Sequence, residues 1–371
     1  MTTDDPEVSE RDPVELACEL NDAAVEAYGA GRAEEALGLF RRALRLLEEA
    51  EGEDSPDVAN VLSSIGAVGE QRCDYAGAEA AYARAAAVME AHTDSADEDV
   101  RRLCLQTLSD LGRIRRILGR YEEAEPHLKR SIAVAEEFFG PDSSETASAL
   151  NDLGMLYKFN GRFEEAEPLY RRALDILESL FGTDAVELAS IYHNLGGLEH
   201  ARGRYSEGEP HARRSVELRE RVLGPGHVDV AADVAALAAL LDGQGKFEES
   251  EPLYRRALAV FERAYGPEHY EVAVNLNNLA MALEARGEVE EAESLLKRAL
   301  SIKERLFGAE NVEWALTANN LGVLYRDQGR RAEAEELLTR ALAAFERSLV
   351  EGHPNLTTCR DNLDALRRAG G

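Results

Sequence analysis

The sequence predicts an all-α protein in which pairs of helices stack side by side as a solenoid. Gly161 to Leu174 reads GRFEEAEPLYRRAL, and a closely related block, GRYEEAEPHLKRSI, begins at Gly119. Eight copies of this block recur along the chain, and each copy carries small and large apolar residues at helical spacing. A single helix pair cannot bury its apolar face alone, so regular repetition of the pair is typical of stacked arrays.

The period of the repeat is regular, with one exception. A small residue marks the same position in each copy: Ala36, Ala78, Ala124, Ala166, Gly208, Ser250, Ala292 and Ala334. Neighbouring copies are 42 residues apart, except for a spacing of 46 between the second and the third. The four extra residues predict an enlarged loop at residues 92–99.

Each repeat is predicted to contain two antiparallel helices. In the second helix of the pair, Ala166, Tyr170 and Ala173 are spaced by four and three, so they share one face. Small residues at both ends of this face let another helix approach, and the large residue fills the gap. The preceding stretch ALNDLGMLYKFN (residues 149–160) has a second helical pattern, in which Gly154 again permits close contact.

Glycine and proline mark the boundaries of the predicted helices. The Gly of each GRF or GRY block suits the left-handed turn that ends a first helix. Proline preference alone would start the second helices at Pro126, Pro168, Pro210 and Pro252. We expect them to start earlier, at the preceding Glu pair, because the small residue two positions before each proline must already lie on the helical face.

The chain is predicted to have three parts. Residues 1–12 form a disordered acidic tail, because the cap, proline and first-turn acid expected at a helix start come only at Asp12, Pro13 and Glu15. Residues 13–348 form the eight-repeat array. Residues 349–371 contain one further helix with a polar face, which is expected to cap the last repeat, and a tail.

These patterns resemble the tetratricopeptide repeat in its 42-residue, kinesin light chain-like form. The resemblance is carried by NLNNLAMALEARGEVEEAESLLKRALSIKERLFG (Asn275 to Gly308) and its sibling copies over residues 15–348. It implies a right-handed superhelix of helix-turn-helix units. It also implies that the first helices line a concave groove that receives peptides or partner proteins.

Composition excludes several classes of partner. The chain has 42 Lys and Arg against 71 Asp and Glu, a formal net charge of −29, which repels nucleic acid and anionic membrane surfaces. Neither a signal peptide nor an apolar stretch of the roughly 20 residues needed to cross a bilayer is present, so a cytoplasmic location is expected. Four widely spaced cysteines are predicted to be small buried residues: Cys18, Cys73, Cys104 and Cys359.

No motif predicts catalysis or a cofactor. The chain lacks a phosphate-binding loop, a nucleophile elbow and a dinucleotide-binding fingerprint. His193 and His200 are spaced by seven beside Glu199, but no third metal ligand accompanies them. We therefore expect a non-enzymatic protein with neither metal nor cofactor.

Recognition is instead expected on the first helices. Each first helix has a small residue at a fixed position. The residue three positions before it is mostly a small hydrogen-bonding one, and the residue four positions after it is basic in the middle copies. The predicted peptide-binding residues are Arg113, Arg116, Asn151, Met155, Lys158, His193, His200, Asn277 and Asn319. The basic residues would favour an acidic peptide. Two alternatives remain open: the basic stretch is a solvated helix face, or the Asn side chains brace neighbouring helices.

The predicted function is that of a scaffold or adaptor whose groove binds a peptide segment of a partner protein. The alternative is a regulatory or sensor subunit that holds a separately encoded effector enzyme, such as a protease or NTPase, through its convex face or its ends.

Overall fold

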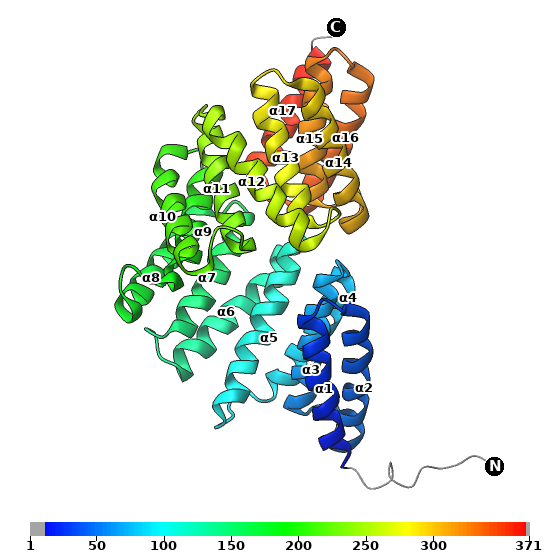
Figure 1. The fold of residues 1–371 in the computed structure, drawn as a ribbon, viewed down its shortest axis with the longest axis vertical. Coiled ribbons are helices and arrows are strands. Elements are labelled where there is room, and N and C mark those ends of the chain that lie inside the picture. Colours follow the sequence, from blue (N-terminus) through cyan, green and yellow to red (C-terminus); the bar gives the residue numbers. More distant parts are fainter. Residues whose placement is uncertain (1–11, 369–371) are drawn as a thin grey trace, which may run out of the picture. The chain divides into compact units, whose positions relative to one another are not determined.

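The computed structural model describes residues 12–368, and in this part of the chain helices follow one another through short turns (Figure 1). The helices in the first part of the chain are α1 (Pro13–Gly29), α2 (Ala33–Glu51), α3 (Pro56–Gln71), α4 (Tyr75–Glu90), α5 (Glu98–Ile117) and α6 (Tyr121–Phe138). They are followed by α7 (Ser144–Phe159), α8 (Phe163–Phe181), the short η2 (Val186–Leu188), α9 (Ala189–Ala201), α10 (Tyr205–Leu223), α11 (Val228–Gly243) and α12 (Phe247–Tyr265). The last are α13 (Tyr270–Ala285), α14 (Val289–Phe307), α15 (Val312–Asp327), α16 (Arg331–Ser348) and α17 (Pro354–Arg368).

The chain divides into two compact units. Unit 1 comprises Met1–Ile117 and Glu122–Pro141, and unit 2 comprises Leu118–Tyr121 and Asp142–Gly371. Unit 1 therefore holds α1 to α5 and nearly all of α6, and unit 2 holds α7 to α17. Each unit is an all-α stack of helical repeats, as the sequence predicts.

Unit 2 is built by the same packing in every repeat. The odd-numbered first helix packs on the second helix that follows it, from the pair α7–α8 to the pair α15–α16. Consecutive first helices also contact one another, in the order α7, α9, α11, α13, α15 and α17. We call the surface formed by these six helices the first-helix face of unit 2. The last helix, α17, packs on both α15 and α16.

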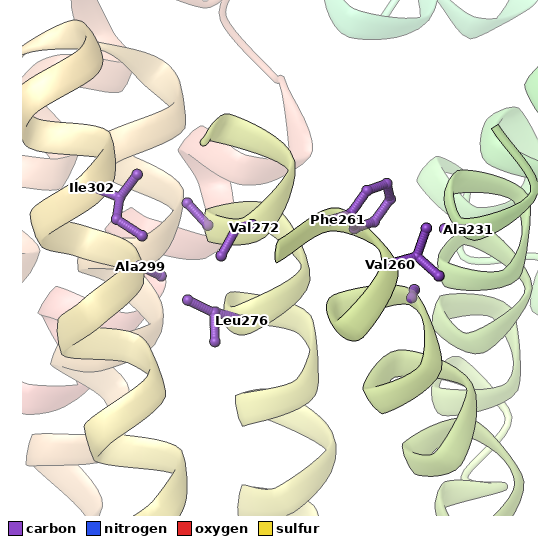
Figure 2. Close-up of a cluster of buried hydrophobic side chains, with 9 residues drawn as sticks. Ala231, Val260, Phe261, Val272, Leu276, Ala299 and Ile302 are labelled. Atoms are coloured by element: carbon purple, nitrogen blue, oxygen red, sulfur yellow. The ribbon is translucent and has the colours of Figure 1, made fainter. Parts of the chain in front are cut away.

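The core lies between repeats as well as within them. Val260 and Phe261 of α12 belong to the same buried cluster as Val272 and Leu276 of α13, the first helix of the next pair (Figure 2). All of these residues are buried. The apolar face of one helix pair is thus covered by the next pair, which confirms the stacking that the repetition predicts.

Small residues allow first and second helices to approach closely. A Cβ atom added to Gly154 would come within 2.7 Å of the ring of Tyr170, and one added to Gly322 within 2.9 Å of Leu338. The large residue of the second helix therefore occupies the space that the glycine of the first helix leaves open. This confirms the predicted alternation of small and large side chains.

Two predicted boundaries are also confirmed. Pro168 lies inside α8, which begins at Phe163, immediately before the Glu pair. The enlarged loop between the second and third repeats lies between α4, which ends at Glu90, and α5, which begins at Glu98. The tail predicted for residues 1–12 falls outside the described residues, except for Asp12, whose side chain accepts a hydrogen bond from the Val14 backbone N–H.

The prediction for the cysteines is only half correct. Cys104 and Cys359 are buried, but Cys18 is exposed and Cys73 is partly exposed. Cys18 lies on α1 outside the face that carries Ala17, Ala24 and Ala27 into the core. Among the helices of the described part, none combines the length and apolarity required to span a bilayer.

Cys73 stands where the other repeats have glycine at the turn between their two helices. Its φ is 58°, in the left-handed region that strains residues with a Cβ atom. We expect Cys73→Gly to raise the free energy of unfolding of unit 1 by about 0.5–1 kcal/mol, measured by urea unfolding. Gly245 provides the reverse test, because it has a φ of 75° and open space around an added Cβ. Gly245→Ala should lower stability by about 1 kcal/mol; equal stability of all three proteins would contradict the strain argument.

Carboxylates on second helices of unit 2 join neighbouring repeats. Glu209 accepts hydrogen bonds from Gln244 Nε2 at 2.8 Å and from Lys246 Nζ at 2.9 Å, and Glu293 accepts one from Arg330 Nη1 at 2.8 Å. The hydrogen bond from Lys246 is the main cause that lowers the pKa of Glu209 to about 2. The hydrogen bond from Arg330 does the same for Glu293, whose pKa is also lowered to about 2. Each carboxylate follows directly after the small residue that marks its repeat, a role that the sequence did not reveal.

These joints predict a loss of stability in acid. A carboxyl with a lowered pKa stabilises the fold above its ordinary pKa of about 4.5, and this contribution is lost as the pH falls toward 2. Glu293→Gln should therefore be less stable than the parent at pH 7, and the difference should vanish near pH 2. Glu290→Gln, an exposed change in the first turn of the same helix, is the control. The measurement is thermal unfolding between pH 2 and pH 7. A stability difference between Glu293→Gln and the parent that does not change with pH would contradict this role.

Candidate functional site

Most of the predicted peptide-binding residues lie on the first helices of unit 2. Asn151, Met155 and Lys158 are on α7, and His193 and His200 are on α9. Asn277 and Asn319 occupy the same register on α13 and α15. Arg113 and Arg116 lie on α5, which belongs to unit 1.

The asparagines form hydrogen-bonded pairs between consecutive first helices. Asn194 Nδ2 donates to Asn151 Oδ1 at 2.8 Å. The same bond, at 3.1 Å, joins the next repeats in the C-terminal half: Asn320 Nδ2 donates to Asn277 Oδ1, and Asn362 Nδ2 donates to Asn319 Oδ1. The predicted alternative, in which Asn side chains brace neighbouring helices, is therefore seen in the structure.

Bracing leaves each of the three predicted asparagines with hydrogen-bonding capacity. An amide nitrogen carries two N–H groups, and each of these asparagines uses its carbonyl oxygen for the brace. Asn277 Nδ2 donates to Asn278 Oδ1 at 3.2 Å, and Asn151 Nδ2 lies 3.9 Å from Met155 Sδ. The asparagines are partly exposed, so a remaining N–H can meet a carbonyl oxygen of a ligand.

Lys158 reaches from α7 to α9. A Cβ atom added to Gly197 of α9 would lie 3.2 Å from Lys158 Nζ, and this Nζ is 4.9 Å from the centre of the Phe159 ring. Burial, and the charge of Lys158 next to it, lower the pKa of His200. His200 is therefore largely neutral at pH 7, and the positive charge of this part of the surface resides on Lys158.

His193 is held by a buried charged pair. Its Nδ1 lies 2.8 Å from Oδ1 of Asp233, a residue of α11 whose side chain is 0% exposed. Arg219 of α10 donates from Nη1 to both oxygens of Asp233, at 2.8 and 2.9 Å, and from Nη2 to Ser190 Oγ at 2.6 Å. His193 itself is 31% exposed.

Arg113 is engaged within unit 1. It donates to both carboxylate oxygens of Glu70 and to Asp110 Oδ1, the last at 2.7 Å. Burial disfavours its charged form, but the hydrogen bonds and charges of Glu70 and Asp110 outweigh burial and raise the pKa of Arg113. The positive charge that the sequence predicted for ligand binding is thus already balanced by two carboxylates at this residue.

Sequence reasoning missed Asp233 and Arg219, although the chain contains a signal for them. Arg219 stands in the register that holds Leu177, Phe261 and Phe345 in other repeats, all of which face the core. Asp233 stands in the register of the buried Ile191. A charged residue at a core position of a repeat needs a buried partner. Two oppositely charged residues at core positions of adjacent repeats are therefore expected to pair with each other.

A stack of helix pairs with a polar, partly exposed row along its first helices is typical of protein–protein interaction scaffolds. Two family models described as tetratricopeptide repeat match the chain, one over residues 19–91, 103–179, 187–249 and 231–305, and the other over residues 314–355. The chain belongs to the tetratricopeptide repeat family. Comparison with curated proteins gives no match.

Several solved structures are similar to this chain over most or part of its length. A Rap protein complexed with competence and sporulation factor has 14% identity, covers 96% of this chain and 99% of its own, and has a TM-score of 0.55. A signal transduction ATPase with a tetratricopeptide repeat sensor, from Pyrococcus horikoshii, has 16% identity, covers 98% and 51%, and has a TM-score of 0.56. Repeats of a putative kinesin light chain from Podosopora anserina have 23% identity, cover 55% and 97%, and have a TM-score of 0.43.

Proposed function

We propose that this protein is a non-enzymatic scaffold or adaptor that binds an extended peptide segment of a partner protein on the first-helix face of unit 2. The observation that carries the proposal is the row of asparagines that fix one another's orientation across repeats. A side chain held in one orientation loses little entropy when it binds a ligand. The Rap protein of similar fold, in complex with competence and sporulation factor, supports a recognition role for such a stack.

The chemistry of α7 and α9 defines the contacts of the proposed ligand. The amide N–H groups of Asn151, Asn277 and Asn319 meet backbone carbonyl oxygens, and the thioether of Met155 provides an adaptable apolar contact. Lys158 favours a carboxylate on the ligand. The contribution of Arg113 and Arg116 stays a prediction, since Arg113 would have to exchange Glu70 or Asp110 for the ligand.

Magnitudes set the length of the ligand. An exposed ion pair contributes at most about 1 kcal/mol, whereas micromolar affinity requires about 8 kcal/mol. Lys158 alone therefore cannot hold an acidic peptide, and contacts on several repeats are needed. The net charge of −29 opposes an acidic ligand, but charges beyond about 8 Å are largely screened at physiological salt.

Charge reversal of Lys158 tests the proposal. Peptides would first be selected on the full chain from a random library displayed on phage, and their affinities measured by fluorescence anisotropy. We expect Lys158→Glu to weaken the selected peptides at least tenfold without lowering the melting temperature, because Lys158 is partly exposed. Lys297→Glu reverses an exposed charge on the second helix α14 and should leave affinity unchanged. Equal affinity of both variants and the parent would rule out this surface as the binding site.

A second candidate is a regulatory or sensor subunit that holds an effector enzyme away from the first-helix face. Large apolar side chains are exposed at the ends of consecutive second helices: Leu180 and Phe181 on α8, Val222 and Leu223 on α10, and Tyr265 on α12. An exposed apolar row is typical of a contact surface. The ATPase with a tetratricopeptide repeat sensor supports this candidate. The present chain spans about half the length of that ATPase.

A further inference from the structure

His193 interrupts the regular bracing of the first-helix face. In three other pairs of consecutive first helices, the residue in the register of His193 is an asparagine that accepts a bond from an asparagine of the next repeat. The next helix after His193 is α11, where the corresponding residue is Ala236, which has no polar side chain. His193 instead bonds to Asp233, three residues earlier on α11.

The charged pair beneath His193 is not needed for stacking. The registers of Arg219 and Asp233 hold Leu177 and Ile191 in the preceding repeat, and both of those residues are buried. A buried ion pair is often no more stabilising than apolar residues of similar volume. The additional effect of the pair in this repeat is its hold on His193.

The bond to Asp233 determines which nitrogen of His193 carries the hydrogen. An ionised carboxylate only accepts hydrogen bonds, so Nδ1 of His193 is the donor. Arg219 balances the charge of Asp233 through hydrogen bonds to both carboxylate oxygens. In this tautomer the lone pair is on Nε2 of His193, and no bond to Nε2 occurs within residues 12–368.

We infer that His193 is a specificity residue of the proposed peptide-binding surface: its Nε2 accepts a hydrogen bond from a hydroxyl, indole or amide side chain of the bound peptide. Asp233 and Arg219 are positioning residues that hold the ring in this form. The inference rests on the proposed peptide binding of unit 2. It adds that the peptide carries a donor, and not a carboxylate, opposite α9, because two acceptors facing each other leave both unpaired.

The form of the ring is measured by nuclear magnetic resonance, independently of any ligand. In protein labelled with ¹⁵N-histidine, the signal of His193 is assigned by its loss in His193→Gln. We expect the neutral ring to carry its hydrogen on Nδ1 and none on Nε2. The double variant R219L/D233I restores the residues of the preceding repeat and should fold normally, but its His193 should lose this preference. A neutral ring with its hydrogen on Nε2, or an unchanged ring in the double variant, overturns the inference.

Recognition is tested with a random peptide library displayed on phage and selected on the full chain, on His193→Phe and on R219L/D233I. We expect peptides selected on the parent to share a donor-bearing residue at one position. Replacing that residue by one without a donor should weaken binding about tenfold or more. Both variants should retain the rest of the consensus and lose the preference at this position.

Two other outcomes are distinguishable. Peptides without a shared donor position, or with the same preference on His193→Phe, overturn the role of His193 and leave peptide binding intact. Failure of the parent to select any peptide overturns the proposed function and this inference with it.

Discussion

Phe261→Ala is expected to lower the free energy of unfolding of unit 2 by about 3–5 kcal/mol. Phe261 is 2% exposed and packs in the cluster that joins α11, α12, α13 and α14 (Figure 2). Its removal opens a cavity between repeats, and each repeat relies on its neighbours to cover its apolar face. Urea unfolding followed by far-ultraviolet circular dichroism measures the loss.

Tyr265→Ala is the matched control for Phe261→Ala. Tyr265 lies one turn further along α12 with its ring centre 6.4 Å from that of Phe261, but its side chain is 45% exposed. We expect a loss below about 1 kcal/mol, since little apolar surface leaves the core. Similar losses for both variants would show that the interface between repeats does not hold the stack together.

Lys303→Met should destabilise unit 2 by about 3–5 kcal/mol at pH 8. Lys303 is 2% exposed, and its Nζ donates to Glu313 Oε2 at 3.1 Å. Burial is the main cause that raises the pKa of Glu271 to about 7. The charge of Glu313 raises this pKa further, and the charge of Lys303 opposes the increase. Without the ammonium group, two carboxylates would share a site that has no counter-charge.

The pH dependence distinguishes this role from a simple packing defect. The folded state holds a proton on Glu271 that the unfolded chain releases near pH 4.5, so the parent should lose stability as the pH rises from about 4.5 to 7. Glu271→Gln should therefore be more stable than the parent at pH 8 and no more stable at pH 4. The penalty of Lys303→Met should shrink at pH 5, where Glu271 is protonated. A penalty that is the same at both values would contradict the account.

The fold could be predicted from the sequence because successive repeats use the same kind of packing contacts. Gly154 opposite Tyr170 is a contact within one repeat, and the same choice of a small and a large residue recurs in the other copies except the fifth, where Gly196 faces Ala212. The enlarged loop before α5 is equally visible as four additional residues. Left-handed glycine turns mark where the first helices end, and Cys73 adopts the same left-handed conformation without being a glycine.

The candidate site was only partly predictable, because its contacts cross between repeats. The register places Asn151 and His193 on the same face of successive helices, but it does not tell which side chains meet. The observed bonds join residues 43 positions apart, as in Asn151 and Asn194, whereas the repeat is 42 residues long. The period alone does not contain this offset.

Charge was the least predictable property of the site. Arg113 and His200 both look basic in the sequence, but Glu70 and Asp110 balance the first, and burial with the nearby Lys158 lowers the pKa of the second. Conversely, Arg219 and Asp233 look like ordinary surface residues until their register is compared with other repeats. A polar residue at a core position is therefore a better guide to this site than a local excess of basic residues.

Cross-linking tests the central claim, that unit 2 binds its partner on the first-helix face. The full chain would be purified from its native host with bound partners, cross-linked through its lysine and acidic side chains, and mapped by mass spectrometry. The account predicts cross-links from the partner to α7 and α9, with Lys158 among the linked residues. Cross-links confined to the ends of α8, α10 and α12, where the exposed apolar row lies, would contradict it and favour a subunit that holds its partner from the other side.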